Sequence, residues 1–194
     1  MPWGVIWVYL PDFLHEQRGL TIDQSSLIVT LFGVGASAGQ LLGAKMGQLA
    51  YNRHSTLQPL LMGATTIGGV LPSMMLIRYD GDKFLWFGLF AVISGILVAA
   101  TGPNIRSVIM NVTLPSSRGM AFGLFNFFDE VGKGLGPALV SLIVVRKGRD
   151  EAFTMVLLAW LGCGIILMSM AFTAQRDELT RPSKGCTLPS SRVD

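Results

Sequence analysis

Four polar side chains that could do chemistry lie together in an otherwise apolar stretch. They are Asn126, Asp129, Glu130 and Lys133. Residues 119–145 around them are long enough to cross a bilayer as one helix. On such a helix the four fall within one arc of about 100°, which Gly119 and Gly123 extend. We call this set the polar stripe. Ionisable groups inside a membrane cost a few kcal/mol and normally face a bundle interior or a water-filled cavity, so the stripe predicts a polar path through a membrane protein.

The stripe has two interpretations. Asp129 and Lys133 are four residues apart with the acid first, the favourable order for an intrahelical pair, so they could simply join helices. Glu130 is then left without a base in its own helix and must find one elsewhere, take up a proton or contact water. In the second interpretation the stripe takes part in transport or its gating, with Asp129 or Glu130 as the residue that couples a proton to it.

Composition supports a membrane protein and excludes several other classes. Of the 194 residues, 51% are hydrophobic and only 14% charged, whereas soluble domains average about 25% charged residues. The formal charge of +3 is too small and too dispersed for a nucleic-acid-binding protein. The sequence has no metal-ligand spacing and no nucleophile motif. We therefore expect no metal, no cofactor, no nucleic-acid partner and no enzyme activity.

Apolar runs divide residues 1–174 into spans, followed by a polar tail. The predicted full spans cover about residues 24–50, 57–77, 84–114, 119–145 and 152–174. Residues 3–14 are apolar but too short to span, so they form either an interfacial helix or the last part of a truncated one. The spans at 57–77 and 152–174 carry no charge and suit lipid-facing positions. We expect residues 175–194 to be a disordered tail.

A ridge of glycines marks the first full span. It consists of Gly35, Gly39, Gly43 and Gly47, one every four residues. Such spacing stacks the glycines on one face and lets another helix approach closely. Gly119 and Gly123 have the same spacing in the span at 119–145, and we expect them to serve helix packing as well. The same glycines would serve either tight static packing or a surface on which two helices slide.

A second polar point follows a predicted break in the span at 84–114. Gly102 and Pro103 should loosen or kink the helix, because proline lacks the backbone donor. Asn104 and Arg106 come directly after the break and could face a cavity. Arg106 could equally extend its charged end to the membrane surface.

Three segments resemble transporters of the major facilitator superfamily. Leu114-Pro-Ser-Ser-Arg-Gly-Met-Ala-Phe-Gly123, followed by Asn126 and Asp129-Glu-Val-Gly-Lys-Gly-Leu-Gly-Pro137, is similar to helix eleven of that superfamily, and in particular to its Spinster-like group. Gly47-Gln-Leu-Ala-Tyr-Asn-Arg53 resembles the turn between helices eight and nine, with Tyr51 in place of the usual acid. Tyr9-Leu-Pro-Asp-Phe-Leu14 resembles the end of helix seven.

The resemblance implies an all-α integral membrane fold. The chain would be the C-terminal six-helix half of a major facilitator superfamily bundle, with its first helix truncated, from part of helix seven through helix twelve. It also implies a cytoplasmic tail. The helix near 84–114 would line the central cavity, and the glycine-bearing helices would pack against the other half. The protein would be multi-pass, in a plasma or endolysosomal membrane that the sequence does not distinguish.

The implied function is secondary transport of a small organic or lipid-like solute by alternating access. That mechanism needs two halves, so we expect the chain to be a fragment or a half-length protein whose partners are membrane lipids and an N-terminal transporter half. An alternative is a truncated, non-transporting protein that binds a full-length transporter through the glycine ridge and modulates it.

Overall fold

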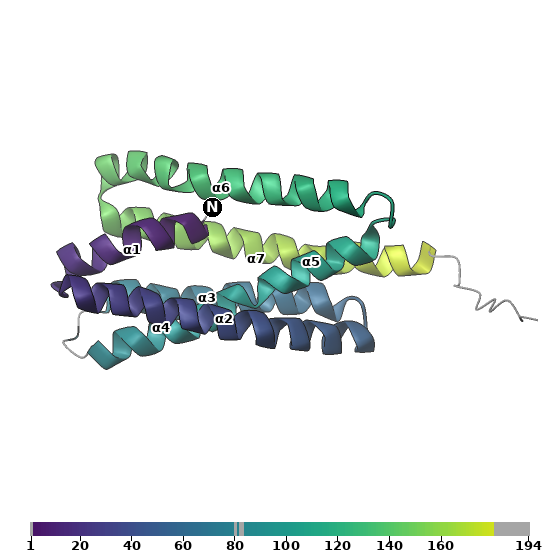
Figure 1. Ribbon diagram of the computed structural model, residues 1–194, viewed down its shortest axis with the longest axis horizontal. Coiled ribbons are helices and arrows are strands. Elements are labelled where there is room, and N and C mark those ends of the chain that lie inside the picture. The colour runs from purple at the N-terminus through teal and green to yellow at the C-terminus, as the bar shows by residue number, and fades with distance from the viewer. Residues whose placement is uncertain (1, 80, 82–83, 181–194) are drawn as a thin grey trace, which may run out of the picture.

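The computed structural model describes residues 2–79, 81 and 84–180, which form a bundle of helices. The helices are α1 (Pro2–Arg18), α2 (Ile22–Arg53), α3 (Leu57–Arg78), α4 (Phe84–Ala99), α5 (Thr101–Val112), α6 (Arg118–Lys147) and α7 (Arg149–Thr180). They run along one long axis (Figure 1). The predicted all-α fold is confirmed.

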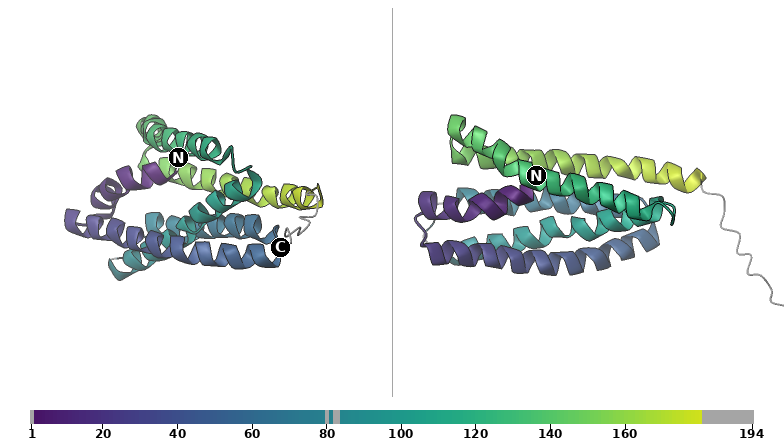
Figure 2. Two further views of the ribbon diagram at one scale, coloured as in Figure 1. Left: turned by 45° about the vertical axis from the view of Figure 1, so that its right-hand side comes forward. Right: turned by 45° about the horizontal axis from the view of Figure 1, so that its top comes forward.

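The helices α2, α3, α4 and α7 form a closely packed block, and α6 is attached to the bundle more loosely. The most extensive contacts join α2 to α4, α3 to α4 and α3 to α7. On the other side, α6 contacts α1, α7 and α5. Figures 1 and 2 show α6 along one edge of the bundle, joined by short links at both of its ends. The polar stripe therefore lies on a helix at the edge of the bundle.

Four segments are long and apolar enough to cross a membrane. They are Ile22–Arg53, Leu57–Arg78, Phe84–Val112 and Arg149–Thr173. α6 has 30 residues and is long enough, but its polar stripe keeps it out of this group. The chain is thus a multi-pass membrane protein, and α6 carries a cluster of charges that its environment must tolerate.

Local signals set several helix ends. Thr21 caps α2 in a capping box, since its hydroxyl accepts from the backbone of Gln24 and the Gln24 side chain accepts from the backbone of Thr21. Gly148, with a φ of 90°, separates α6 from α7. This left-handed backbone favours glycine and allows the abrupt reversal between the two helices.

The span predicted at 84–114 is two helices, α4 and α5, separated at Ala100. Pro103 lies three residues beyond this point. Because it has no N–H, the carbonyl of Ala99 loses its helical donor. The break therefore has a covalent cause that is present in the sequence.

Two predicted boundaries are wrong. α1 runs without interruption through Pro11 to Arg18, beyond the predicted end at residue 14, because a proline inside a helix removes only one backbone donor. α7 continues to Thr180, so residues 175–180 are helical rather than the start of a disordered tail. The rest of the predicted tail, residues 181–194, lies outside the described residues.

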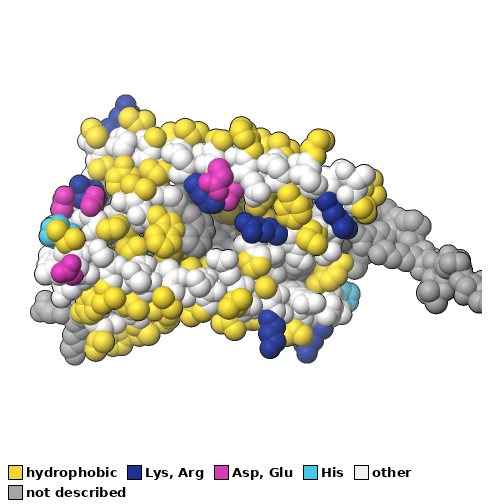
Figure 3. Space-filling model, in the orientation of Figure 1, with side chains coloured by type: hydrophobic (Ala, Val, Ile, Leu, Met, Phe, Trp, Pro, Cys, Tyr) yellow, Lys and Arg dark blue, Asp and Glu magenta, His cyan; other side chains and the backbone are white. Residues whose placement is uncertain are grey.

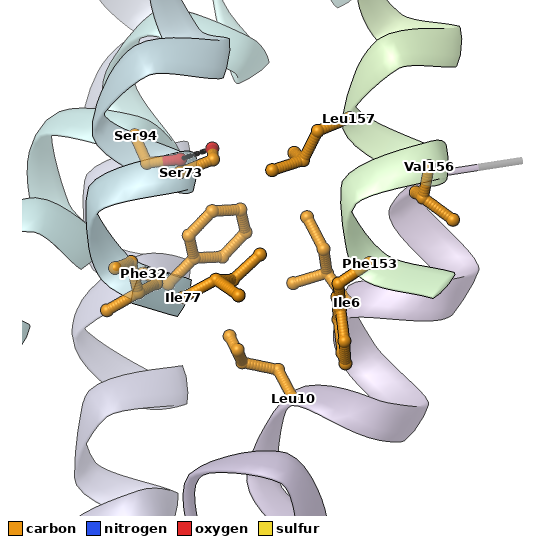
Figure 4. A pocket seen from close by; sticks show the side chains of 10 residues that line it. Ile6, Leu10, Phe32, Ser73, Ile77, Ser94, Phe153, Val156 and Leu157 are labelled. Carbon is orange, nitrogen blue, oxygen red and sulfur yellow. Dashed lines mark hydrogen bonds between the residues drawn. The ribbon is translucent and has the colours of Figure 1, made fainter. Parts of the chain in front are cut away.

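The apolar core lies where α1 meets α2, α3, α4 and α7. Figure 4 shows Ile6 and Leu10 of α1 facing Phe32 and Ile77 across a small cavity of about 10 Å³. Nearby, the rings of Phe13 and Phe153 pack with centroids 4.8 Å apart and join α1 to α7. The short α1 is therefore fixed to the block mainly by its apolar side chains.

Candidate functional site

The charged part of the polar stripe is an ion triad on α6. Lys133 Nζ lies 2.7 Å from Asp129 Oδ2 and 2.8 Å from Glu130 Oε1. The prediction that Glu130 has no base in its own helix is wrong, because Lys133 reaches the residues three and four positions before it. Two carboxylates that share one ammonium leave the triad with one net negative charge when all three groups are ionised.

The triad is accessible. The side chains of Lys133 and Asp129 are each 38% exposed, and that of Glu130 is 71% exposed. Figure 3 shows the acidic and basic atoms of α6 together on the edge that faces the middle of the bundle. We call the surface in Figure 3, made by α6, α1, α5 and α2, the front face. Exposed charges on a helix of a membrane bundle must contact water or another protein surface, since lipid chains cannot solvate them.

The remaining members of the stripe are exposed as well. Asn126 is solvent-accessible, and a Cβ added at Gly119 or Gly123 would meet nothing within 4 Å. Neither glycine therefore serves close packing within the described residues, although their spacing predicted such a role. Among the described residues, the side of α6 that carries Gly119, Gly123 and Asn126 is therefore exposed.

Backbone contacts with α1 hold the triad segment. A Cβ at Gly4 would lie 2.3 Å from the backbone oxygen of Lys133, so only glycine allows α1 to approach there. Five residues later, the Tyr9 hydroxyl donates to the carbonyl oxygen of Pro137 at 3.3 Å. The lysine backbone is therefore fixed against α1 while its side chain remains accessible.

The two polar residues after the helix break separate. Arg106 is exposed on α5, and no salt bridge to it is found among the described residues. Asn104 is only 2% exposed, so the prediction that it faces a cavity is wrong. The two are two positions apart on one helix, about 200°, and therefore point in nearly opposite directions.

The glycine ridge is filled by the chain itself. Added Cβ atoms at Gly35, Gly39 and Gly43 would lie 2.4, 2.2 and 2.4 Å from backbone oxygens of α4 and of Ala100, and one at Gly47 would lie 1.5 Å from Asn104 Oδ1. The ridge is therefore an internal interface between α2 and the α4–α5 pair. It is not free to bind a second transporter or the other half, as the sequence analysis had expected.

A row of polar contacts between α3 and the α4–α5 pair was not predicted from the sequence. Ser73 bonds to Ser94, the Thr66 hydroxyl lies 2.8 Å from that of Thr101, and Gln58 donates to Asn104 at 3.3 Å. The spacing of seven residues between the first two pairs, on both helices, was a signal in the sequence. The apolar, uncharged character of residues 57–77 suggested a lipid-facing helix instead. α3 packs against α4 through its polar side and also against α7, while Leu60, Leu71 and Met75 leave an apolar strip exposed on its other side.

Comparison with known proteins gives a consistent family. The family model described as Major Facilitator Superfamily matches residues 1–192. A fosmidomycin resistance protein of Escherichia coli K12 is 28% identical over 135 residues, which cover 70% of this chain and 31% of that protein. A probable sulfoacetate transporter of Cupriavidus necator is 26% identical over 167 residues, 83% of this chain and 38% of that protein.

A third relative is also named as a transporter. A probable galactarate/D-glucarate transporter of Pseudomonas putida is 23% identical over 145 residues, 74% of this chain and 31% of that protein. The chain thus spans about a third of the length of the curated relatives it matches. No solved structure is significantly similar to it.

Proposed function

Because the chain belongs to the Major Facilitator Superfamily, we propose that it supplies the C-terminal six-helix half of a secondary transporter. The front face would pack against an N-terminal half, and the two would move a small organic solute by alternating access. The observation that carries the proposal is the exposed ion triad of α6, which has no place against lipid and suits the wall of a water-filled path.

The geometry of α6 supports a functional rather than a purely structural stripe. Residues that only join helices would be buried between them, whereas Glu130 is 71% exposed and Gly119 and Gly123 face open space. The triad also has an excess carboxylate, which can exchange a proton or meet a basic group of the partner half. We assign Asp129 or Glu130 as the coupling residue and Asn126 and Arg106 as further residues of the path.

The solute is proposed as small and organic. Relatives are named for sulfoacetate and for galactarate or D-glucarate, which are small organic acids. The helix-eleven motif instead suggests the Spinster-like group and a lipid-like solute. Small organic acids and lipid-like solutes are thus the two solute classes within this proposal, and the uptake assay distinguishes between them.

The test is uptake by the native full-length protein that contains this chain, purified into proteoliposomes. The probes are radiolabelled D-glucarate, sulfoacetate and a lysophosphatidylcholine, each with and without a proton gradient. We expect uptake of at least one probe, and at least a tenfold loss in Asp129→Asn or Glu130→Gln and in Lys133→Met. Lys45→Met removes an exposed lysine of α2 and should retain full uptake.

Unchanged uptake in all three stripe variants would refute the functional role of the triad. An immunoblot of membranes with an antibody to residues 175–194 establishes the polypeptide length. A band well above 20.9 kDa supports a half within a longer transporter. A band near that mass requires a separate N-terminal half, and failure to co-purify one would contradict the proposal.

A further inference from the structure

We propose that Asn104 is a positioning residue that fixes α5, and with it Arg106, against α2 and α3. Its amide closes a hydrogen-bonded group with Gln58 and the carbonyls of Gly43 and Ala100, which we call the Asn104 knot. The role of Arg106 in a solute path rests on the proposed function. The position of α5 does not.

All three hydrogen-bonding groups of the Asn104 amide are used. Its nitrogen donates to the carbonyl oxygens of Gly43 at 2.9 Å and Ala100 at 2.8 Å, and its oxygen accepts from Gln58 Nε2 at 3.3 Å. Backbone carbonyls can only accept, so the NH₂ group must be the end that faces them. The Asn104 side chain thus joins α5 to α2, to α3 and to Ala100, the residue between α4 and α5.

Gly47 makes the knot possible. A Cβ at this position would lie 1.5 Å from Asn104 Oδ1, whereas ordinary contact begins at 3.4 Å, so the amide would have to retreat by about 1.9 Å. The nearby Gly43 likewise has its Cβ position 2.4 Å from the backbone oxygen of Ala100. The last two glycines of the ridge therefore bring α2 close enough for the Asn104 amide to reach a backbone carbonyl.

α5 depends on this knot because it has little apolar packing of its own. Its buried residues are Thr101 and Asn104, both polar. Thr101 lies at the first position of the helix, so Asn104 is the buried residue that lies farther from the junction with α4. Pro103 removes one backbone hydrogen bond at the junction, so α4 holds α5 less firmly than a continuous helix would. The orientation of α5 is therefore set by directional hydrogen bonds rather than by a buried apolar face.

The arrangement is unsuited to solute binding by Asn104 itself. The side chain is 2% exposed and its partner Gln58 is also 2% exposed. Arg106, two residues later, is on the exposed side. Asn104 acts on the path through the helix that carries Arg106, which makes it a positioning residue and not a ligand.

The test is a spin-label distance in the full-length protein with its native cysteines replaced by serine. Nitroxides are attached at Leu41→Cys on α2 and Met110→Cys on α5, which are 77% and 47% exposed. Two independent variants break the knot. Asn104→Ala removes the amide, and Gly47→Ala displaces it while leaving Asn104 in place.

Two controls match these variants. Ser94→Ala removes a buried hydrogen bond between α3 and α4 away from the break, and Gly102→Ala adds a methyl group on α5 where nothing lies within 4 Å. A general loss of stability would appear in Ser94→Ala as well as in Asn104→Ala. Only a positioning role predicts that the distance changes in the knot variants alone.

We expect the α2–α5 distance distribution to shift or broaden in both knot variants, with a shift of up to about 1.9 Å in Gly47→Ala, where the added Cβ displaces the amide, and to stay unchanged in both controls. If one of the two knot variants does not fold, the distance measured in the other tests the proposal. An unchanged distance overturns the proposal, as does an equal change in the controls. Loss of folded protein in both knot variants, with both controls folded, also overturns it, because the knot would then hold the whole bundle. The distance is measured without solute, so absence of uptake would refute the proposed function and leave this result intact.

Discussion

Substitution of Gly39 by alanine should push α2 and α4 apart. A Cβ at this position would lie 2.2 Å from the backbone oxygen of Ile96 and 2.7 Å from its Cα. To restore ordinary contact at 3.4 Å, the two helices must separate by about 1.2 Å. Overpacking of this kind costs about 1–3 kcal/mol, while the higher helix propensity of alanine returns about 1 kcal/mol.

Gly68→Ala is the control that removes the propensity effect. Gly68 is also inside a helix, and an added Cβ there meets nothing within 4 Å. The difference in unfolding free energy between the two variants therefore reports the steric cost alone, about 1–3 kcal/mol. The assay is equilibrium unfolding in mixed detergent micelles with increasing SDS, followed by tryptophan fluorescence.

A rescue experiment separates backbone from side-chain collisions. At Gly39 the colliding atoms belong to the Ile96 backbone, so Ile96→Ala should not rescue Gly39→Ala. At Gly69 the nearest atom is Cγ2 of Val98 at 2.5 Å, so Val98→Ala should rescue much of the effect of Gly69→Ala in a double-mutant cycle. If Gly39→Ala is as stable as Gly68→Ala, α2 and α4 are not closely packed and the reasoning fails.

Three further changes test other contacts. Arg149→Gln breaks the 2.6 Å pair with Glu16, whose side chain is 58% exposed. The free energy of unfolding should fall by less than about 1 kcal/mol. A larger loss that persists in high salt would contradict a surface ion pair. Lys133→Met leaves two unneutralised carboxylates on α6, so thermal stability in nanodiscs should fall, and neutralising both acids as well should restore it; no restoration would mean that charge is not the cause. Ser94→Ala should cost about 0.6 kcal/mol, typical of hydrogen bonds between membrane helices, and if the same substitution in a Ser73→Ala background costs as much, the two hydroxyls do not interact.

The sequence was most informative where one helix was read by itself. The break near Pro103 and the common face of the polar stripe both depend on neighbours within about one or two turns. Helix ends at residues 18 and 180 were less predictable. At these two positions the surrounding residues allow the helix either to continue or to end, and packing against other helices or contact with solvent determines which occurs.

Contacts between helices were predicted less well, because periodicity shows a face but not its neighbour. The four-residue spacing of the glycine ridge correctly indicates close approach of another helix, yet that helix is α4–α5 of the same chain rather than a partner protein. Asn104 illustrates the same limit. A lone amide beside a helix break is compatible with a cavity or with a buried knot, and only the position of Gln58 and Gly43 decides.

The packing itself explains why the charged stripe lies on α6 and not elsewhere. The ridge glycines and the hydroxyl pairs join α2, α3, α4 and α5 so closely that an ion pair with accessible water has no room between them. Among the described side chains of α6, by contrast, only Gly136 and Val140 are buried. A charged side chain on a membrane helix is tolerated only where water or a polar surface reaches it. The most weakly packed helix of the bundle is therefore also the one on which the ion triad costs least.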